Sequence, residues 1–273
     1  MPATTHTTLN DHAVVSRERW IAERKALLAR ERELTRLHDQ IAAERRALPW
    51  ERVDKDYTFD TPTGKRRLAD LFAGRRQLLV QHFMLGPGWE QGCPSCSYMA
   101  DHADGMNVHL AQRDVTLVAI SRAPLAEIQR FQRRMGWQFD WVSSYGSDFN
   151  FDFGVSFTPE QIAKGQVGYN YGTSPHVHDE LPGISVFCMN DAGEAFHTYS
   201  TYGRGVEVMM GTYHMLDLMP NGRNERDVEN KMEWVRHHDR YEPAHAGKST
   251  AGSCCEAHNL AQVATQSMND ARR

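Results

Sequence analysis

Apolar residues recur every seven positions along the first part of the chain. The repeating positions are Trp20, Leu27, Leu34, Ile41 and Leu48. No Gly or Pro interrupts residues 16–48, so the spacing predicts one long helix with Ser16 as its N-cap and Pro49 at its end. A single narrow apolar stripe either docks on a domain or pairs with a second copy of the chain. We expect an arm docked on the domain or on a partner subunit, and a homodimer formed through this helix stays open as the alternative.

Continuous apolar runs alternate with helical patterns after this arm. The runs "RQLLVQHFML" (76–85) and "DVTLVAIS" (114–121) are typical of strands buried on both faces, and "WQFDWVSS" (137–144) predicts a third strand. The segments "SYMADHADGMNVHLAQ" (97–112) and "APLAEIQRFQRRMG" (123–136) between these strands predict helices. A short strand, a turn at Gly64 and a helical turn precede the first run.

The second half of the chain predicts a hairpin followed by helices. Strands at 184–190 and 194–200 flank a turn at Asp191-Ala192-Gly193, and helices are expected within 206–220 and 225–241. Alternation followed by a hairpin predicts an α/β fold with a mixed sheet and helices on both faces. The predicted organisation is a disordered start (1–15), the helical arm (16–52), one domain (53–242) with an insertion around 145–181, and a weakly ordered tail (243–273).

Composition excludes several functional classes. The 273 residues are 40% hydrophobic and 24% charged, with a net charge of −4, so neither nucleic acid nor membrane is expected as a partner. No apolar run approaches the ~18 residues of a membrane span, and the first residues carry no signal-peptide pattern. We expect a cytoplasmic protein.

Two of the five cysteines form a motif at the junction between a predicted strand and a predicted helix. Cys93-Pro94-Ser95-Cys96 follows the run 76–85. At a helix start, unpaired backbone N–H groups stabilise a thiolate, and proline suits the first turn because its missing N–H leaves nothing unsatisfied. The motif predicts a dithiol exchange site in which Cys93 attacks and Cys96 resolves the mixed disulfide.

The same motif is also half of a metal site. His176 and His178 could complete a Cys2His2 set, although two histidines in a loop are more often surface residues. Pro182 directly precedes the hairpin, and in thiol-redox folds a cis-proline at such a place faces the dithiol and leaves backbone groups free to pair with substrate. This context favours the redox interpretation over the metal one.

The remaining cysteines and a run of aromatic residues predict less. Cys188 is expected to be a buried, inert thiol, and Cys254 and Cys255 belong to the loose tail. The aromatic run either lines a pocket over the dithiol or packs in the core. It comprises Trp137, Trp141, Tyr145, Phe149, Phe151 and Phe153.

These motifs together resemble a known family. "GKRRLADLF", "LLVQHFMLGPGWEQGCPSCS" and "LPGISVFCMNDAGE" are similar to the thioredoxin superfamily. With "ERRALPWERVDKDYTFDTPTGK" and "MEWVRHHDRYE" they resemble, over roughly residues 10–242, the bacterial domain of unknown function 899 family, described as predicted dithiol-disulfide oxidoreductases. The resemblance implies a thioredoxin-like fold, Cys93 and Cys96 as the redox pair, and Pro182 at the cis-proline position.

The sequence departs from related families at positions beside the motif. Gly92 stands where thioredoxin has a Trp, and Trp89 is the nearest tryptophan; we expect Trp89, Pro94 and Pro182 to contact substrate. Peroxiredoxins carry Pro and Thr or Ser where this chain has Gly86 and Glu90.

The expected function is thiol-disulfide oxidoreductase acting on a protein or small-molecule disulfide or thiol. No cofactor is expected, because no glycine-rich phosphate loop is present. The alternatives are a peroxiredoxin-like thiol peroxidase, or a metal-binding or redox-sensing scaffold that uses the same cysteines.

Overall fold

The computed structural model describes residues 12–175, 178–225 and 231–242. By its contacts the chain divides after Asp239 into two units, and the first, Met1–Asp239, contains the sheet and the dithiol. His176, Val228, Cys254 and Cys255 lie outside the described residues.

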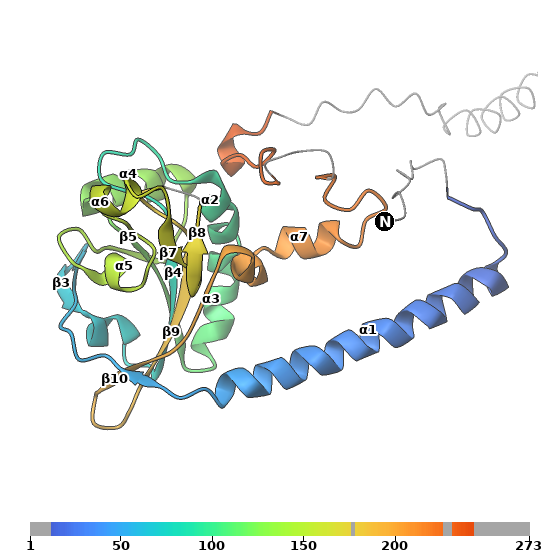
Figure 1. Ribbon diagram of the computed structural model, residues 1–273, viewed down its shortest axis with the longest axis horizontal. Helices are drawn as coiled ribbons and strands as arrows, with labels where there is room; N and C mark the ends of the chain where they lie inside the picture. Colours follow the sequence, from blue (N-terminus) through green and yellow to red (C-terminus); the bar gives the residue numbers. More distant parts are fainter. Residues whose placement is uncertain (1–11, 176–177, 226–230, 243–273) are drawn as a thin grey trace, which may run out of the picture. The chain divides into compact units, whose positions relative to one another are not determined.

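A mixed eight-stranded sheet forms the centre of the protein (Figure 1). Its order is β1-β10-β9-β4-β5-β6-β2-β3, with β4, β5 and β6 parallel and β9 antiparallel to β4. The strands are β1 (Glu51–Arg52), β2 (Thr58–Thr61), β3 (Gly64–Arg67), β4 (Gln77–His82), β5 (Val115–Ser121), β6 (Asp140–Ser143), β9 (Gly183–Met189) and β10 (Ala195–Tyr202).

The central part of this sheet has the thioredoxin-like arrangement. Two parallel strands, β4 and β5, are joined through helices, and an antiparallel hairpin, β9 and β10, continues the sheet beyond β4. The predicted α/β fold, with a mixed sheet flanked by helices and an N-terminal helix, is confirmed. Sequence runs of continuous apolar residues sit in β4 and β5 because both faces of these strands are covered.

Each face of the sheet carries its own hydrophobic core. Leu117 and Ala119 of β5 belong to one core and Val118 and Ile120 to the other, as the alternation of side chains along a strand requires. The first core receives side chains from α2 (Pro94–Ala100), α3 (Ala103–Ala111), α4 (Leu125–Met135), η2 (Gly203–Met209) and α7 (Gly211–Leu216). The second receives them from η1 (Leu68–Phe72) and α5 (Phe149–Asp152).

The helix predicted after the cysteine motif is divided in two. Asp101 and His102 keep right-handed helical backbone angles between α2 and α3. His102 N–H bonds to the carbonyl of Met99, three residues back, instead of continuing the four-residue ladder. The Asp101 carboxylate meanwhile accepts a hydrogen bond from Trp137, so the break is tied to packing against the loop before β6.

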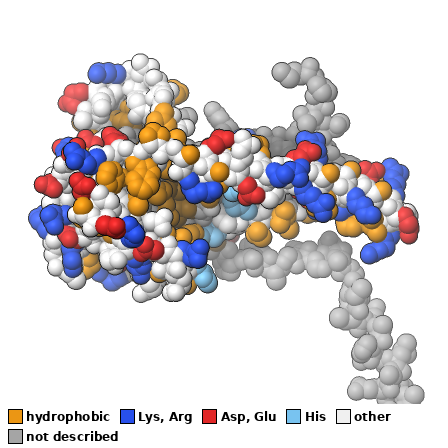
Figure 2. Space-filling model, turned by 90° about the horizontal axis from the view of Figure 1, so that it is seen from below, with side chains coloured by type: hydrophobic (Ala, Val, Ile, Leu, Met, Phe, Trp, Pro, Cys, Tyr) orange, Lys and Arg blue, Asp and Glu red, His pale blue; other side chains and the backbone are white. Residues whose placement is uncertain are grey.

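The long N-terminal helix is α1 (Arg17–Arg46), and the Ser16 hydroxyl caps it by accepting a hydrogen bond from Arg19 N–H. No α1 residue is buried, so the described residues show no docking of α1 on the domain, and docking on a partner subunit stays a prediction. Leu34 is 67% exposed and Trp20 57%, and apolar side chains are visible among charged ones on the surface (Figure 2).

The segment 145–181 contains short elements of its own. Beyond α5 it forms α6 (Pro159–Ile162) and a small hairpin of β7 (Val167–Tyr169) and β8 (Gly172–Ser174). An isolated β-bridge between Ser156 and Glu180 joins the part before α6 to the part after β8.

The helix expected within 225–241 is wrong for its described part, where only η3 (His238–Arg240) is helical. Lys231 and Trp234 both hydrogen-bond to Glu225, and Val235 and His237 are buried. Residues 231–237 are therefore held by these individual contacts and not by one apolar face of a helix. In the described residues, no helix is both long and apolar enough to cross a bilayer.

Candidate dithiol site

Cys93 and Cys96 lie where a loop from β4 enters α2. Cys93 is the N-cap residue of α2, Pro94 occupies the first turn, and Cys96 is one turn further in. Cys93 is half-buried, Cys96 is fully buried, and both are free thiols. The arrangement leaves one sulfur accessible and places the other behind it.

Three hydrogen bonds hold the two cysteines against the end of β4. Cys93 N–H donates to the Met84 carbonyl over 3.0 Å, and Met84 N–H donates to Cys96 Sγ over 3.5 Å. The buried Gln81 side chain donates to the Cys96 carbonyl over 3.1 Å. The dithiol is therefore anchored to the most central strand of the sheet.

The two thiols have opposite acidities. A hydrogen bond from Cys96, with further donors in the first turn of α2 around Ser95, lowers the pKa of Cys93 to about 6. The same hydrogen bond and burial raise the pKa of Cys96 well above its ordinary value. The arrangement therefore favours a thiolate at Cys93 and a protonated Cys96 that donates the hydrogen bond between them.

Gly92, directly before the motif, is required by close packing. A Cβ at this position would lie 2.5 Å from Phe83 and 2.8 Å from Phe131. The tryptophan that thioredoxin has here would not fit, which explains the departure noted in the sequence.

The carbonyl of Gly92 is held by a residue 145 positions later. His237 Nε2 donates to it over 2.8 Å, and Arg134 contacts His237 Nδ1 while it pairs with Asp239 and Gln91. The sequence analysis missed this role. The only signal was the motif "MEWVRHHDRYE", and nothing in the spacing shows that it returns to the dithiol.

A cavity of about 890 Å³ opens at the dithiol. Cys93, Cys96, Pro182 and His178 line it, so the structure brings together residues from two distant parts of the sequence. Its walls come largely from η2, α7 and residues 221–225 and 231–232. Trp89 and Pro94 lie outside the lining: Trp89 packs against Gly86 and the first core, and Pro94 is in the first turn of α2.

Pro182 faces the dithiol cavity, but its backbone differs from the expectation. No described peptide bond is cis, so the expected cis-proline is wrong. The trans isomer is the intrinsically favoured one, and here the neighbouring backbone groups are satisfied within the chain. Leu181 N–H bonds to Val155, and the Pro182 carbonyl accepts from Tyr169 Oη over 2.6 Å.

A buried ion pair that the sequence did not indicate lies near Cys96. Glu180 accepts from Arg122 over 2.6 Å and from Ser156 over 2.7 Å. Burial raises the pKa of Glu180 to about 7, although Arg122 opposes the shift. Its charge also contributes to the raised pKa of Cys96.

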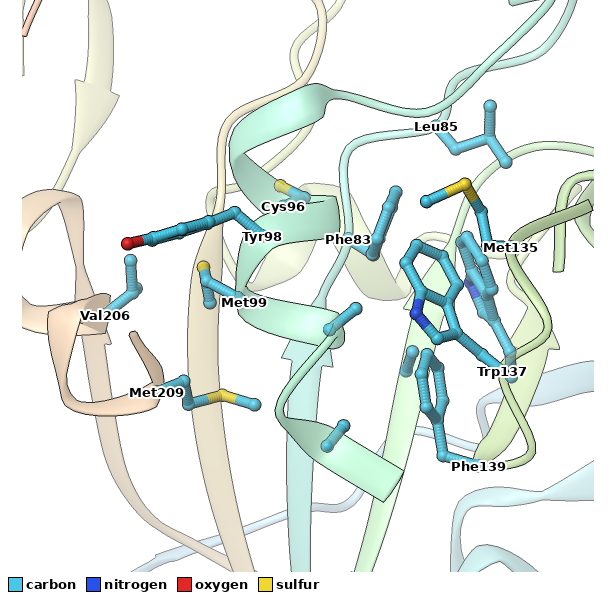
Figure 3. Packing of buried hydrophobic residues seen from close by; sticks show 14 of the residues in the cluster. Phe83, Leu85, Cys96, Tyr98, Met99, Met135, Trp137, Phe139, Val206 and Met209 are labelled. Atoms are coloured by element: carbon cyan, nitrogen blue, oxygen red, sulfur yellow. The ribbon is translucent and has the colours of Figure 1, made fainter. Parts of the chain in front are cut away.

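The six residues of the aromatic run stand outside the cavity lining. Trp137 and Trp141 belong to the first core and Phe149 to the second, with Phe153 packed against it. Figure 3 shows Trp137 among Phe83, Met135 and Phe139, away from Cys96. Core packing is therefore the role of these four residues of the run, whereas Tyr145 is exposed.

Cys188 is half-buried on β9, not fully buried as expected. It lies opposite Gln77 at the start of β4, whereas the dithiol follows the end of β4. The two sites are therefore at opposite ends of this strand.

The surroundings of the dithiol also bear on a metal site and on a peroxidase site. Within the described residues no group of three or more His, Cys, Asp or Glu could hold a metal ion. Glu90, at one peroxiredoxin position, is exposed and is not part of the lining. Of the described lining residues, the arginines are Arg204, which pairs with Glu207, and Arg223, which pairs with Asp217 and Glu207.

The parallel pair β4 and β5, the antiparallel hairpin β9 and β10, and the cysteine pair at the start of the helix after β4 define the fold as thioredoxin-like. The chain belongs to the family described as bacterial protein of unknown function (DUF899), whose model matches residues 9–241. None of the curated proteins matches the chain.

Solved structures that match part of the chain include peroxidoxin BcpB from Mycobacterium tuberculosis, at 15% identity and a TM-score of 0.42, covering 60% of this chain and 95% of that one. The bacterioferritin comigratory protein of Xanthomonas campestris has 9% identity and a TM-score of 0.38, covering 57% and 88%. A Chlorobium tepidum protein assigned as a thiol:disulfide interchange protein DsbE has 12% identity and a TM-score of 0.36, covering 62% and 97%.

Proposed function

We propose that the protein is a thiol-disulfide oxidoreductase in which Cys93 is the nucleophile and Cys96 the resolving thiol. The observation that carries this proposal is the pairing of the two sulfurs: an accessible Cys93 at the N-cap of α2, hydrogen-bonded by a buried Cys96 one turn behind it. An attacking thiol works best when its pKa lies near the ambient pH, and a value of about 6 meets that condition.

The reaction proceeds in two exchanges. Cys93 thiolate attacks one sulfur of a disulfide RS–SR′, forming Cys93–S–S–R and releasing R′S⁻. The Cys96 proton passes to the released thiolate, and Cys96 sulfur then attacks Cys93 sulfur, forming the intramolecular disulfide and releasing RS⁻. The substrate gains two electrons and the protein loses them. A separate dithiol reductant returns the protein to its reduced form.

Disulfide exchange is favoured over peroxide reduction and over metal binding by the surroundings of Cys93. A peroxidase needs a guanidinium that binds the peroxide, yet the two arginines described in the lining are engaged by carboxylates. A metal site needs further ligands, and the described residues bring no third one to the dithiol.

A trapped intermediate tests the proposal. Cys96→Ser protein, treated with a small disulfide, should accumulate a stable mixed disulfide on Cys93, measured as a mass increase equal to one half of the reagent. Cys93→Ser is the matched control and should accumulate little, because Cys96 is buried and has a raised pKa. Equal labelling of the two variants would contradict the assigned roles.

A further inference from the structure

The cavity at the dithiol has walls that suit an apolar molecule. Four methionines line it, and Met99 and Met210 are buried in the same core as Cys96. Leu181 and Val206 add aliphatic surface. Figure 3 shows Val206 pointing toward Tyr98 and Met99 of α2, on the side of the core that contains Cys96. Methionine side chains adapt to apolar ligands of different shape.

Most charged groups described in the lining already have partners within the chain: both arginines pair with carboxylates, and Lys231 Nζ donates to the Glu225 backbone carbonyl over 2.8 Å. Arg204 bonds to Glu207 over 2.8 Å, and Arg223 bonds to Asp217 over 2.8 Å. Glu225 accepts hydrogen bonds from Tyr213 over 2.7 Å and from Trp234 over 2.6 Å. A charged ligand would have to leave water for a site whose charges are mostly satisfied, which is costly.

The backbone beside the dithiol is also occupied. A protein substrate would bind in extended form by pairing with free N–H and carbonyl groups, as in β-strand addition. Leu181 N–H and the Pro182 carbonyl both have partners inside the chain. Gly203 N–H, next to them in the lining, donates to Tyr169 Oη over 2.9 Å.

From these three features we infer that the substrate is a small, uncharged, apolar organic disulfide that enters the cavity, and not a protein disulfide. This inference rests on the proposed function and narrows it. An apolar group of the substrate lies against Met210 and Val206 while its sulfur meets Cys93. The cavity of about 890 Å³ is within the range that encloses small ligands.

The test measures how fast Cys93 reacts with two reagents of equal chemistry and different side groups. Benzyl methanethiosulfonate and 2-sulfonatoethyl methanethiosulfonate each transfer their thiol group to a thiolate and release methanesulfinate. The rate constant for the benzyl reagent is divided by that for the sulfonatoethyl reagent, first on the protein and then on N-acetylcysteine. The quotient on the protein should exceed the quotient on N-acetylcysteine by on the order of tenfold or more. The first quotient divided by the second is the normalised ratio. A normalised ratio near one, or one that favours the charged reagent, would overturn the inference.

A pair of variants locates the effect. Val206→Phe fills the cavity and should return the normalised ratio toward one, whereas Val208→Phe, on the same element but 68% exposed, should keep it. If Val206→Phe does not fold, the wild-type ratio still decides the question. An unchanged ratio in folded Val206→Phe would contradict the assigned position of the apolar group.

Turnover separates this inference from the proposed function. Reduction of dipropyl disulfide should be faster than that of oxidised glutathione or insulin, at equal concentrations of disulfide. If glutathione disulfide or insulin is reduced faster, the substrate class is wrong while the oxidoreductase function stands. If reduced and oxidised forms of the Cys93–Cys96 pair cannot be interconverted at all, the proposed function itself fails.

Discussion

His237 donates its Nε2–H to the carbonyl oxygen of Gly92 over 2.8 Å, and Gly92 is the residue directly before Cys93. A second hydrogen bond holds the same loop, from Cys93 N–H to the carbonyl of Met84. His237 is buried and touches neither sulfur in these hydrogen bonds, so it is a positioning residue. Its effect on Cys93 passes through the peptide group that it holds.

Replacing His237 should therefore disturb both stability and acidity. His237→Phe keeps a ring beside Phe131 but leaves the Gly92 carbonyl without its donor, which costs about 1–3 kcal/mol in the free energy of unfolding. The loop relaxes and the pKa of Cys93 rises toward that of an ordinary thiol. Chemical denaturation and the pH dependence of alkylation measure the two effects.

His238→Phe is the matched control for that variant. His238 is the next residue and pairs with Asp101 at the surface, so its loss should cost less than about 1 kcal/mol. An alkylation profile that shifts equally in both variants would contradict a specific role for His237.

Gly92→Ala should destabilise the protein. The new methyl group would meet the rings of Phe83 and Phe131 at distances that no stable packing permits. The expected cost is about 1–3 kcal/mol, typical of overpacking in a core. Gly105→Ala, in the exposed interior of α3 with no atom near its Cβ position, should instead stabilise by about 0.5–1 kcal/mol. Thermal unfolding of the two variants gives the comparison, and equal effects would show that Gly92 has room.

The reactivity of Cys93 should depend on Cys96. In the wild type the alkylation rate rises with pH as the thiolate forms, with a midpoint at a pH of about 6. Cys96→Ala removes the main hydrogen bond to the thiolate, so the midpoint should move toward the ~8.5 of a free thiol. Cys96→Ser keeps an O–H donor and should give an intermediate midpoint. Identical midpoints in Ala and Ser variants would show that the hydrogen bond is not the cause.

Glu180 should make stability depend on pH. Because burial raises its pKa from 4.5 to about 7, the folded protein keeps a proton that the unfolded chain has released between these pH values. The free energy of unfolding therefore falls as pH rises through this window, by about 3 kcal/mol for a group of this kind.

Denaturation of wild type and Glu180→Gln across pH 4–8 checks this dependence. The stability of the wild type relative to the variant should fall with rising pH, whereas the relative stability of an exposed control, Asp191→Asn, should hardly change. A relative stability that rises with pH would mean that the ion pair with Arg122 outweighs burial.

Local patterns were sufficient to predict the central sheet and the dithiol. The runs in β4 and β5 are largely apolar because both faces are buried, and Cys93 and Cys96 are close in sequence, so their spacing alone indicates that the two thiols meet.

The rest of the site depends on contacts between distant segments. Three such contacts join Gln81 to Cys96, Glu180 to Arg122, and His237 to Gly92, and no sequence spacing encodes these pairs. A helix was expected within 206–220 from its apolar content. This region is instead divided between η2 and α7, and residues of both line the cavity.

The most direct test of the account is a redox titration of the protein in glutathione buffers, comparing the wild type with Cys93→Ser and Cys96→Ser. We expect one reversible two-electron couple in the wild type, measured as the loss of two free thiols on oxidation. Neither variant should show such a couple. A wild-type protein whose Cys93 and Cys96 stay reduced over the whole range, or a couple that survives in either variant, would contradict it.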